Sequence, residues 1–320
     1  MSTYRIGILE FGYRHGGQSS MHALMDVNDL CRRADELGFH YYWLTEHHVN
    51  RVLSAWSCPR LLLPLLLQQT DRIRIGMAGV LSNFHAPYRV ALDFKLLANL
   101  FPNRVDLGFA NGRPSLRVAS ALRTEELRAY PDDFNARVAD TLRYLRKEQW
   151  VMEKDRIILP PAFGALPECY QLGSSLRDWR RAVDNECHLV KSTFHSVDAL
   201  EGDEIEDAGR YRDAFQAAHG YAPRVMMALA LSCVPTAAER ADVYRSMTDM
   251  QGGGATVNHF IGTPDATATY LADLQRRYGV TDFIIRPVSG HHEHHLRTLQ
   301  LLADHGLLRG AHTKKTLTHV

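Results

Sequence analysis

A carboxylate and two adjacent histidines follow one short apolar segment, and these side chains are the best suited to chemistry. The segment covers residues 41–44 and leads directly into Glu46, His47 and His48. An imidazole titrates near neutral pH and can give or take a proton in a redox cycle. The competing interpretation is a structural histidine that pairs with Glu46 and holds the loop. The position of His47 and His48 in the fold decides between the two.

Two further apolar segments, residues 72–76 and 104–108, end in residues that could contact a cofactor. The first leads through Gly76 to Ala78 and Gly79, small residues that let a flat ring approach the backbone. Close packing of a neighbouring helix would explain them equally well. The second leads to Asn111 and Arg113, which could meet a phosphate through amide groups and a cation.

Another apolar segment, residues 168–172, is followed by Gly173, Ser174 and Ser175. The pattern predicts a helix over residues 176–182, so the two hydroxyls would lie at a helix N-terminus, where unpaired N–H groups favour an anion. Capping of the helix without any ligand is the ordinary alternative. Arg177, one turn into this helix, could add charge or lie in solvent.

A run of histidines near the C-terminus resembles a metal site only superficially. His291 and His295 are spaced i, i+4 at the expected start of the last helix, where a polar turn facing solvent is the favoured interpretation. The sequence contains no HExxH, paired CxxC or G-x-S-x-G motif. These absences disfavour a metalloprotease, a zinc ribbon and an α/β-hydrolase.

Strand-like and helix-like segments alternate along the chain, which predicts parallel strands joined by crossover helices. Helices are expected over residues 25–37, with Gly38 as C-cap, and from Pro87 to about residue 100. Eight strands are expected, at residues 4–9, 41–44, 72–76, 104–108, 168–172, 188–191, 225–231 and 282–285.

Eight such repeats predict an α/β fold of the (β/α)₈ TIM-barrel type. A doubly wound open sheet is the alternative, but no glycine-rich turn follows the first strand. In a barrel the active site lies at the carboxyl ends of the strands. His47, the small residues after the third strand and the polar residues after the fourth and fifth would then face one site.

Length and composition predict one soluble, cytoplasmic domain over residues 1–320. The chain is 45% hydrophobic and 23% charged, and its 37 Lys+Arg residues balance 36 Asp+Glu, so no net field would attract nucleic acid. The longest apolar stretch, residues 61–67, is too short to span a bilayer, and no signal peptide is visible. Five cysteines without a CxxC pair fit a reducing compartment.

Several motifs, taken in order, resemble the bacterial luciferase-like flavin-dependent monooxygenases. The resemblance covers most of the chain and is most specific in the first hundred residues. The motifs are GILEF (7–11), ADELGFHYYWLTEHH (34–48), RIRIGMAGVLSNFHAPYRVALDF (72–94), NRVDLGFANG (103–112), YQLGSS (170–175) and IGTPDA (261–266).

The resemblance implies a luciferase-like barrel that uses reduced FMN and dioxygen to oxidise a small organic substrate, with the protein orienting the cofactor and excluding water. His47 matches the family's catalytic histidine. Ala78 and Gly79 match a non-prolyl cis peptide that supports the flavin ring. Ser174 and Ser175 match the segment that contacts the phosphate.

One position departs from the family pattern. Many relatives carry an arginine after the fourth strand where this chain has Asn111, and a neutral amide cannot replace a charged bidentate contact. Three consequences stay open: weaker FMN binding, substitution by Arg113 or Arg177, or a different flavin. The family's reactive cysteine near this turn is Ala110 here, so no thiol role is expected.

We expect a two-component system in which a separate reductase supplies reduced FMN, because no nicotinamide-binding motif is present. The alternatives are a deazaflavin-dependent oxidoreductase on the same barrel and a non-catalytic flavin-binding homologue. A homodimer is also expected, through apolar helix faces at residues 58–67 and 90–100, with core packing as the competing explanation. The sequence does not identify the substrate or the kind of oxygenation.

Overall fold

The computed structural model describes residues 3–14, 17–48, 54–195, 203–248 and 258–310. Eight parallel strands close into a barrel, because β1 pairs with both β2 and β9, and β7 pairs with both β6 and β9. The barrel strands are β1 (Arg5–Glu10), β2 (Tyr41–Leu44), β3 (Arg74–Leu81), β4 (Val105–Ala110), β5 (Glu168–Gly173), β6 (His188–Ser192), β7 (Val225–Cys233) and β9 (Asp282–Arg286).

The predicted (β/α)₈ barrel and its eight strands are therefore confirmed, and the open sheet is excluded. The third strand continues to Leu81, five residues beyond its predicted end at Gly76. A short ninth strand, β8 (Phe260–Gly262), pairs in parallel with the last residues of β7 and is not one of the eight barrel strands. The glycines in β3 hid its length, because they weaken the apolar pattern of a strand.

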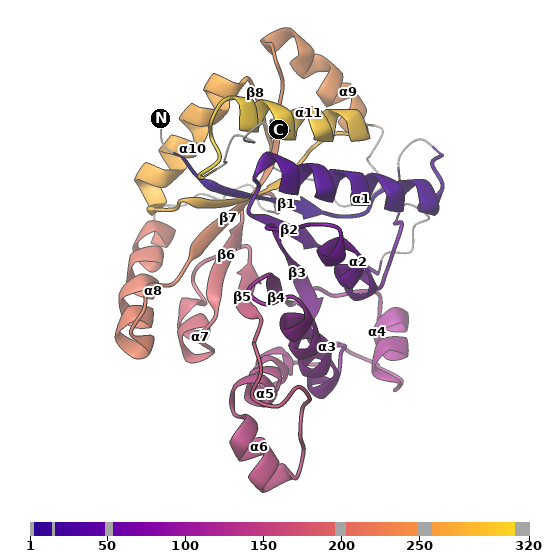
Figure 1. Ribbon diagram of the computed structural model, residues 1–320, viewed down its shortest axis with the longest axis vertical. Helices are drawn as coiled ribbons and strands as arrows, with labels where there is room; N and C mark the ends of the chain where they lie inside the picture. The colour runs from indigo at the N-terminus through magenta and orange to yellow at the C-terminus, as the bar shows by residue number, and fades with distance from the viewer. Residues whose placement is uncertain (1–2, 15–16, 49–53, 196–202, 249–257, 311–320) are drawn as a thin grey trace, which may run out of the picture.

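Helices surround the strands, and α5 and α6 extend furthest from the barrel at the lower end of the view in Figure 1. The helices are α1 (Ser20–Leu37), α2 (Leu63–Gln68), α3 (Pro87–Leu100), α4 (Leu116–Arg123), α5 (Phe134–Arg146), α6 (Glu148–Asp155), α7 (Trp179–Asp184), α8 (Asp203–His219), α9 (Arg240–Thr248), α10 (Pro264–Tyr278) and α11 (His292–Asp304), with 3₁₀ turns η1 (Pro59–Leu61) and η2 (Ala237–Glu239).

The first helix shows how local signals set the boundaries. Ser19 caps α1 by accepting a hydrogen bond from the His22 backbone, so the helix begins five residues before the predicted Met25. Gly38 ends it in the left-handed conformation, at φ 90°, as predicted. Pro87 occupies the first turn of α3, where its missing N–H costs nothing.

Side chains alternate between two cores, as expected for a barrel strand. In β2, Tyr41 and Trp43 pack inside the barrel, whereas Tyr42 and Leu44 pack against the helices. The Trp43 indole donates to the buried Asp106 carboxylate at 2.8 Å. The filled interior leaves the carboxyl ends of the strands as the place for a ligand. Within the described residues, no helix is both long and apolar enough to cross a bilayer.

Candidate active site

A cavity of about 660 Å³ opens at the carboxyl ends of the barrel strands. The structure brings six of the seven predicted site residues to its lining, although they come from β3 and from the segments after β2, β4 and β5. These six are His47, Ala78, Gly79, Asn111, Arg113 and Ser174. Ser175 lies outside the lining and is half-buried. The cofactor contacts of these residues stay a prediction.

The peptide bond between Ala78 and Gly79 is cis, as the resemblance implied. Both residues line the cavity from the middle of β3. A Cβ atom on Gly79 would lie 2.5 Å from the Leu172 side chain and 2.6 Å from the Gly108 carbonyl oxygen. Close contact with strands β4 and β5, rather than with a helix, therefore explains this glycine.

His47 is held at the cavity wall by contacts on two sides. Its Nδ1 lies 3.0 Å from the Thr45 hydroxyl, and its ring stacks on Phe11 with centroids 5.0 Å apart. Burial lowers the pKa of His47 to about 4, and the positive charge of Arg286 acts in the same direction. The imidazole is therefore neutral at pH 7 and can accept a proton.

His48, in contrast, takes the structural role that the sequence left open. Its Nε2 lies 2.9 Å from Glu46 Oε1, and His85 Nε2 lies 2.5 Å from the same oxygen. The Leu81 backbone donates to the other oxygen at 3.2 Å. Against the effect of burial, these hydrogen bonds lower the pKa of Glu46 to about 2. An ionised Glu46 thus ties the β2 loop to the end of β3.

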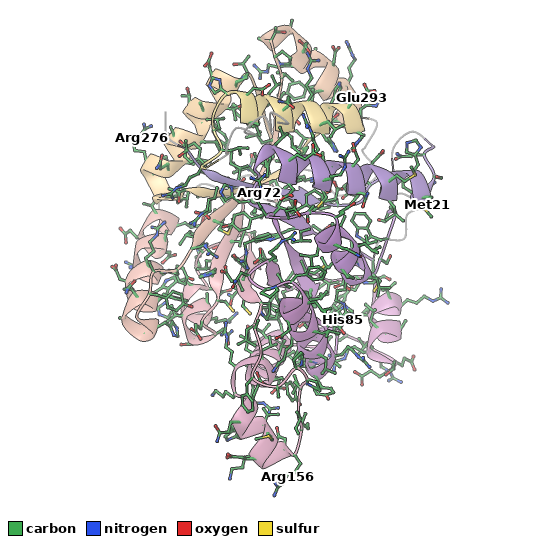
Figure 2. The ribbon with its side chains drawn as sticks, in the orientation of Figure 1. Met21, Arg72, His85, Arg156, Arg276 and Glu293 are labelled. Carbon is green, nitrogen blue, oxygen red and sulfur yellow. The ribbon has the colours of Figure 1, made fainter. Side chains whose placement is uncertain are left out.

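His85 was missed by the sequence analysis, because it lies 39 positions from Glu46 in a different loop. Figure 2 shows His85 beside the start of α3. Its other ring nitrogen faces the Arg60 guanidinium at 3.4 Å, and Arg60 pairs with Asp93 at 2.8 Å. This chain of contacts anchors the histidine motif to the outer helices.

The region after β4 offers groups suited to an anion, and α4 begins there. Arg113 and Ser115 line the cavity, and the Ser115 hydroxyl caps α4 by accepting from the Val118 backbone at 3.4 Å. The Asn111 amide oxygen accepts a hydrogen bond from Asn83 at 2.7 Å. Arg177, the other proposed substitute for the missing arginine, is not part of the lining, so Arg113 is the better placed cation.

The predicted helix start after β5 is wrong. The helix α7 begins at Trp179 with Asp178 as N-cap, so Ser174 and Ser175 precede it and do not lie at a helix N-terminus. The Ser175 hydroxyl accepts a hydrogen bond from the Arg177 backbone at 3.1 Å and forms a local turn. These two serines therefore do not form the helix N-terminal site that the sequence predicted.

Two other cavity-side features were missed, although both follow barrel strands. His195, after β6, lines the cavity with its Nδ1 2.7 Å from the Ser192 hydroxyl. Arg286, at the end of β9, is buried with its guanidinium carbon 4.4 Å from the centre of the Phe11 ring. Burial and Arg286 both lower the pKa of His195. Applying the strand-end rule to every strand would have identified both residues.

The histidine run near the C-terminus forms part of the α11 start, as predicted. His294 contacts the Ser289 hydroxyl at 2.8 Å, and His295 Nε2 lies 2.9 Å from the Ser289 carbonyl oxygen. His294 and His295 are half-buried rather than facing solvent. Among the described residues, no group of three or more possible ligands is placed to hold a metal ion.

A closed barrel with a ligand-sized cavity at its carboxyl face defines the architecture, and comparisons with known proteins show which proteins the chain resembles. Residues 5–154 match the luciferase-like monooxygenase family. The N-acetyl-S-alkylcysteine monooxygenase of Bacillus subtilis is 26% identical over 285 residues, covering 86% of this chain and 82% of that protein. The N-terminal part of the chain is thus similar to the luciferase-like monooxygenases, as its motifs implied, and a protein of that name in Escherichia coli is 30% identical over 178 residues.

Solved structures share the fold over nearly the whole chain. Apo-MsnO8 superposes with a TM-score of 0.82 at 23% identity, covering 96% of this chain and 98% of that one. The oxygenating constituent of 3,6-diketocamphane monooxygenase of Pseudomonas putida, solved in complex with FMN, gives 0.71 at 16%, covering 94% and 97%. An F420-dependent secondary alcohol dehydrogenase gives 0.64 at 13%, covering 93% and 98%.

Proposed function

We propose that this monooxygenase uses reduced FMN and dioxygen to oxidise a small organic substrate in the barrel-mouth cavity. The observation that carries the proposal is the convergence of His47, the Ala78–Gly79 segment, Arg113 and Ser174 on one cavity. A structural relative was solved with FMN. That similarity supports the choice of flavin.

The cavity fits such a cofactor in size and in lining. Its volume of about 660 Å³ lies within the range of roughly 300–1,000 Å³ that is common for cofactor and ligand sites. The middle of β3 offers a small-residue surface for a flat ring. Arg113, Asn111 and Ser174 offer a cation, an amide and a hydroxyl for an anionic tail.

Reduced FMN, when bound, would supply the electrons that activate dioxygen. Thr45 holds Nδ1 of His47, which leaves Nε2 as the nitrogen available to a ligand. Because His47 is neutral at pH 7, we assign it the role of proton acceptor. Phe11 and Phe194 line the same cavity and would limit the access of water to the reacting atoms.

A deazaflavin-dependent oxidoreductase is the second candidate, favoured by the shared fold of an F420-dependent dehydrogenase and by Asn111 in place of the expected arginine. Such an enzyme transfers hydride and consumes no oxygen. Measuring oxygen uptake with reduced FMN and, separately, with reduced F420 distinguishes the two candidates.

The decisive experiment is anaerobic titration with reduced FMN, followed by rapid mixing with oxygenated buffer. We expect saturable binding and a transient flavin absorbance that differs between the wild type and His47→Asn. His22→Asn is the matched control, because His22 lies in solvent on α1 with its side chain 66% exposed. If reduced FMN does not bind, or if binding leads to no oxygen consumption with any substrate tested, the proposed function is wrong.

A separate flavin reductase is the proposed partner, and we propose that residues 1–320 act as one cytoplasmic domain. All five cysteines are free thiols, as expected in a reducing compartment. Because a separate protein would reduce the flavin, turnover should depend on an added reductase and NAD(P)H. Turnover with NAD(P)H alone would contradict the two-component arrangement.

We also propose a homodimer through η1, α2 and α3. Leu61 and Leu65 are 72% and 60% exposed, and Leu96 and Leu100 on α3 are 50% and 60% exposed. The Arg60–Asp93 ion pair joins η1 to α3, which places these leucines on one side of the molecule. Core packing does not account for such exposed leucines, whereas a subunit interface would bury them.

A further inference from the structure

A buried ion pair lies beneath the loop that follows β5, outside the cavity lining. Lys191 Nζ contacts Glu204 Oε2, and the two residues are only 1% and 4% exposed. Removing two charges from water is costly, and a buried ion pair is weak evidence for stability by itself. The position of the pair therefore calls for an explanation in terms of what it holds in place.

The alternation of β6 places the ammonium group on the outer face of the barrel. Val190 and Ser192 line the cavity, so Lys191 between them points the opposite way, toward the helix layer. Glu204 reaches the same place from the first turn of α8. The pair thus lies behind the loop, with the cavity on its other side.

This pair sets the direction of the peptide between Ser174 and Ser175. Lys191 Nζ donates a hydrogen bond to the Ser174 carbonyl oxygen at 3.1 Å, so this carbonyl points outward. In a trans peptide the N–H points opposite to the C=O, which directs the Ser175 N–H toward the cavity side. The Ser174 residue itself lines the cavity.

The amides that follow are already used. Glu204 Oε1 accepts from the Leu176 backbone at 3.1 Å, and the Ser175 hydroxyl accepts from the Arg177 backbone at 3.1 Å. The Ser175 N–H has no acceptor among the described residues. It is therefore available to a ligand, and it lies beside Ser174, a residue of the cavity wall.

We propose that Lys191 and Glu204 are positioning residues that turn the Ser174–Ser175 peptide so that its N–H can bind the phosphate of the flavin. The inference rests on the proposed function. The sequence predicted that a helix N-terminus would bind the phosphate here, but no helix begins at these serines. In the present proposal, a single amide that the ion pair orients takes that role. It also gives the phosphate a partner that does not depend on the arginine missing at position 111.

A general contribution to folding is the competing explanation, and the chain offers a matched control for it. Lys95 on α3 is fully buried and pairs with Glu148 at the start of α6, and neither residue lines the cavity. Replacing either pair by methionine and glutamine removes both charges and leaves no lone buried ion. Glutamine at position 204 can still accept from the Leu176 backbone.

The test compares the dissociation constants of reduced FMN and reduced riboflavin, measured anaerobically by tryptophan fluorescence. Riboflavin has the same ring and lacks the phosphate. In Lys191→Met/Glu204→Gln, FMN should bind about tenfold more weakly, as for one lost hydrogen bond to a charged group, while riboflavin binding should stay unchanged. Lys95→Met/Glu148→Gln should keep the wild-type preference for FMN.

Two outcomes would overturn the inference, and they differ from each other. If the wild type prefers FMN and Lys191→Met/Glu204→Gln keeps the same preference, the ion pair does not position the phosphate site, and the proposed function stands. If the wild type binds FMN and riboflavin equally, no phosphate site exists here, and the proposed use of FMN loses its support as well.

Discussion

The lowered pKa of His47 should depend in part on Arg286, so replacing this arginine by methionine tests the electrostatics of the cavity. The guanidinium carbon lies 4.4 Å from the centre of the Phe11 ring, on which His47 stacks at 5.0 Å. Methionine keeps much of the side chain's apolar volume and removes its charge. The aromatic residues around His47 should stay in place.

The size of the effect follows from these distances. The charge and the imidazole are at most about 9 Å apart, which at an effective dielectric constant of about 20 corresponds to nearly 2 kcal/mol. Since one pKa unit corresponds to about 1.4 kcal/mol, Arg286→Met should raise the pKa of His47 from about 4 to about 5. Burial, the larger cause, accounts for the remaining depression.

Nuclear magnetic resonance measures this pKa directly, by titrating the imidazole ¹⁵N shifts and assigning His47 through its absence in His47→Asn. Arg286→Lys is the control, because it keeps the positive charge and should leave the pKa near 4. An unchanged pKa in Arg286→Met would refute the electrostatic reasoning. An equal rise in both variants would attribute the effect to packing around Phe11.

Three further outcomes are expected. Glu46→Gln should lower the free energy of unfolding by about 1–3 kcal/mol in urea titrations, because the single amide oxygen can accept either from the Leu81 N–H or from the two histidines, but not from both sides; Glu125→Gln, at an exposed carboxylate, should have little effect. Because the pKa values of His47 and His188 both lie near 4 in the fold, below the ordinary 6.5, the unfolded chain binds more protons in this window, so stability should fall as pH drops from about 6.5 to 4; a flat profile would argue against buried neutral imidazoles. Leu65→Glu should shift the protein from dimer to monomer in sedimentation velocity at micromolar concentration, whereas Leu166→Glu, at a leucine 41% exposed near α6, should not; a wild-type monomer would rule out the dimer.

The family motifs and the strand pattern carried the prediction of the barrel and of its catalytic face. Residues 41–44 and 282–285 were recognisable because buried parallel strands are continuously apolar, and this property survives without any tertiary context. Once eight strands were expected, the rule that sites lie at strand ends brought His47, Ala78, Asn111 and Ser174 together. The structure places these four residues at one cavity.

The contacts between side chains could not be predicted from the sequence, because they join segments that are far apart in the chain. The pairing of Glu46 with His85 spans 39 positions, and the stacking of Arg286 over Phe11 joins the last barrel strand to the first. No periodicity encodes such contacts. The first contact holds the Glu46 carboxylate that His48 also contacts, and the second places a positive charge that lowers the pKa of His47.

The loop after β5 also separates what the sequence predicted from what only the structure shows. Its serines were visible in the sequence, whereas the start of α7 at Trp179 and the outward turn of the Ser174 carbonyl were not. Lys191 and Glu204 determine that turn from two other elements, β6 and α8. The strands and their order could be predicted from local sequence patterns. The direction of each polar group depends on the charged side chains, distant in the chain, that contact it once the barrel has formed.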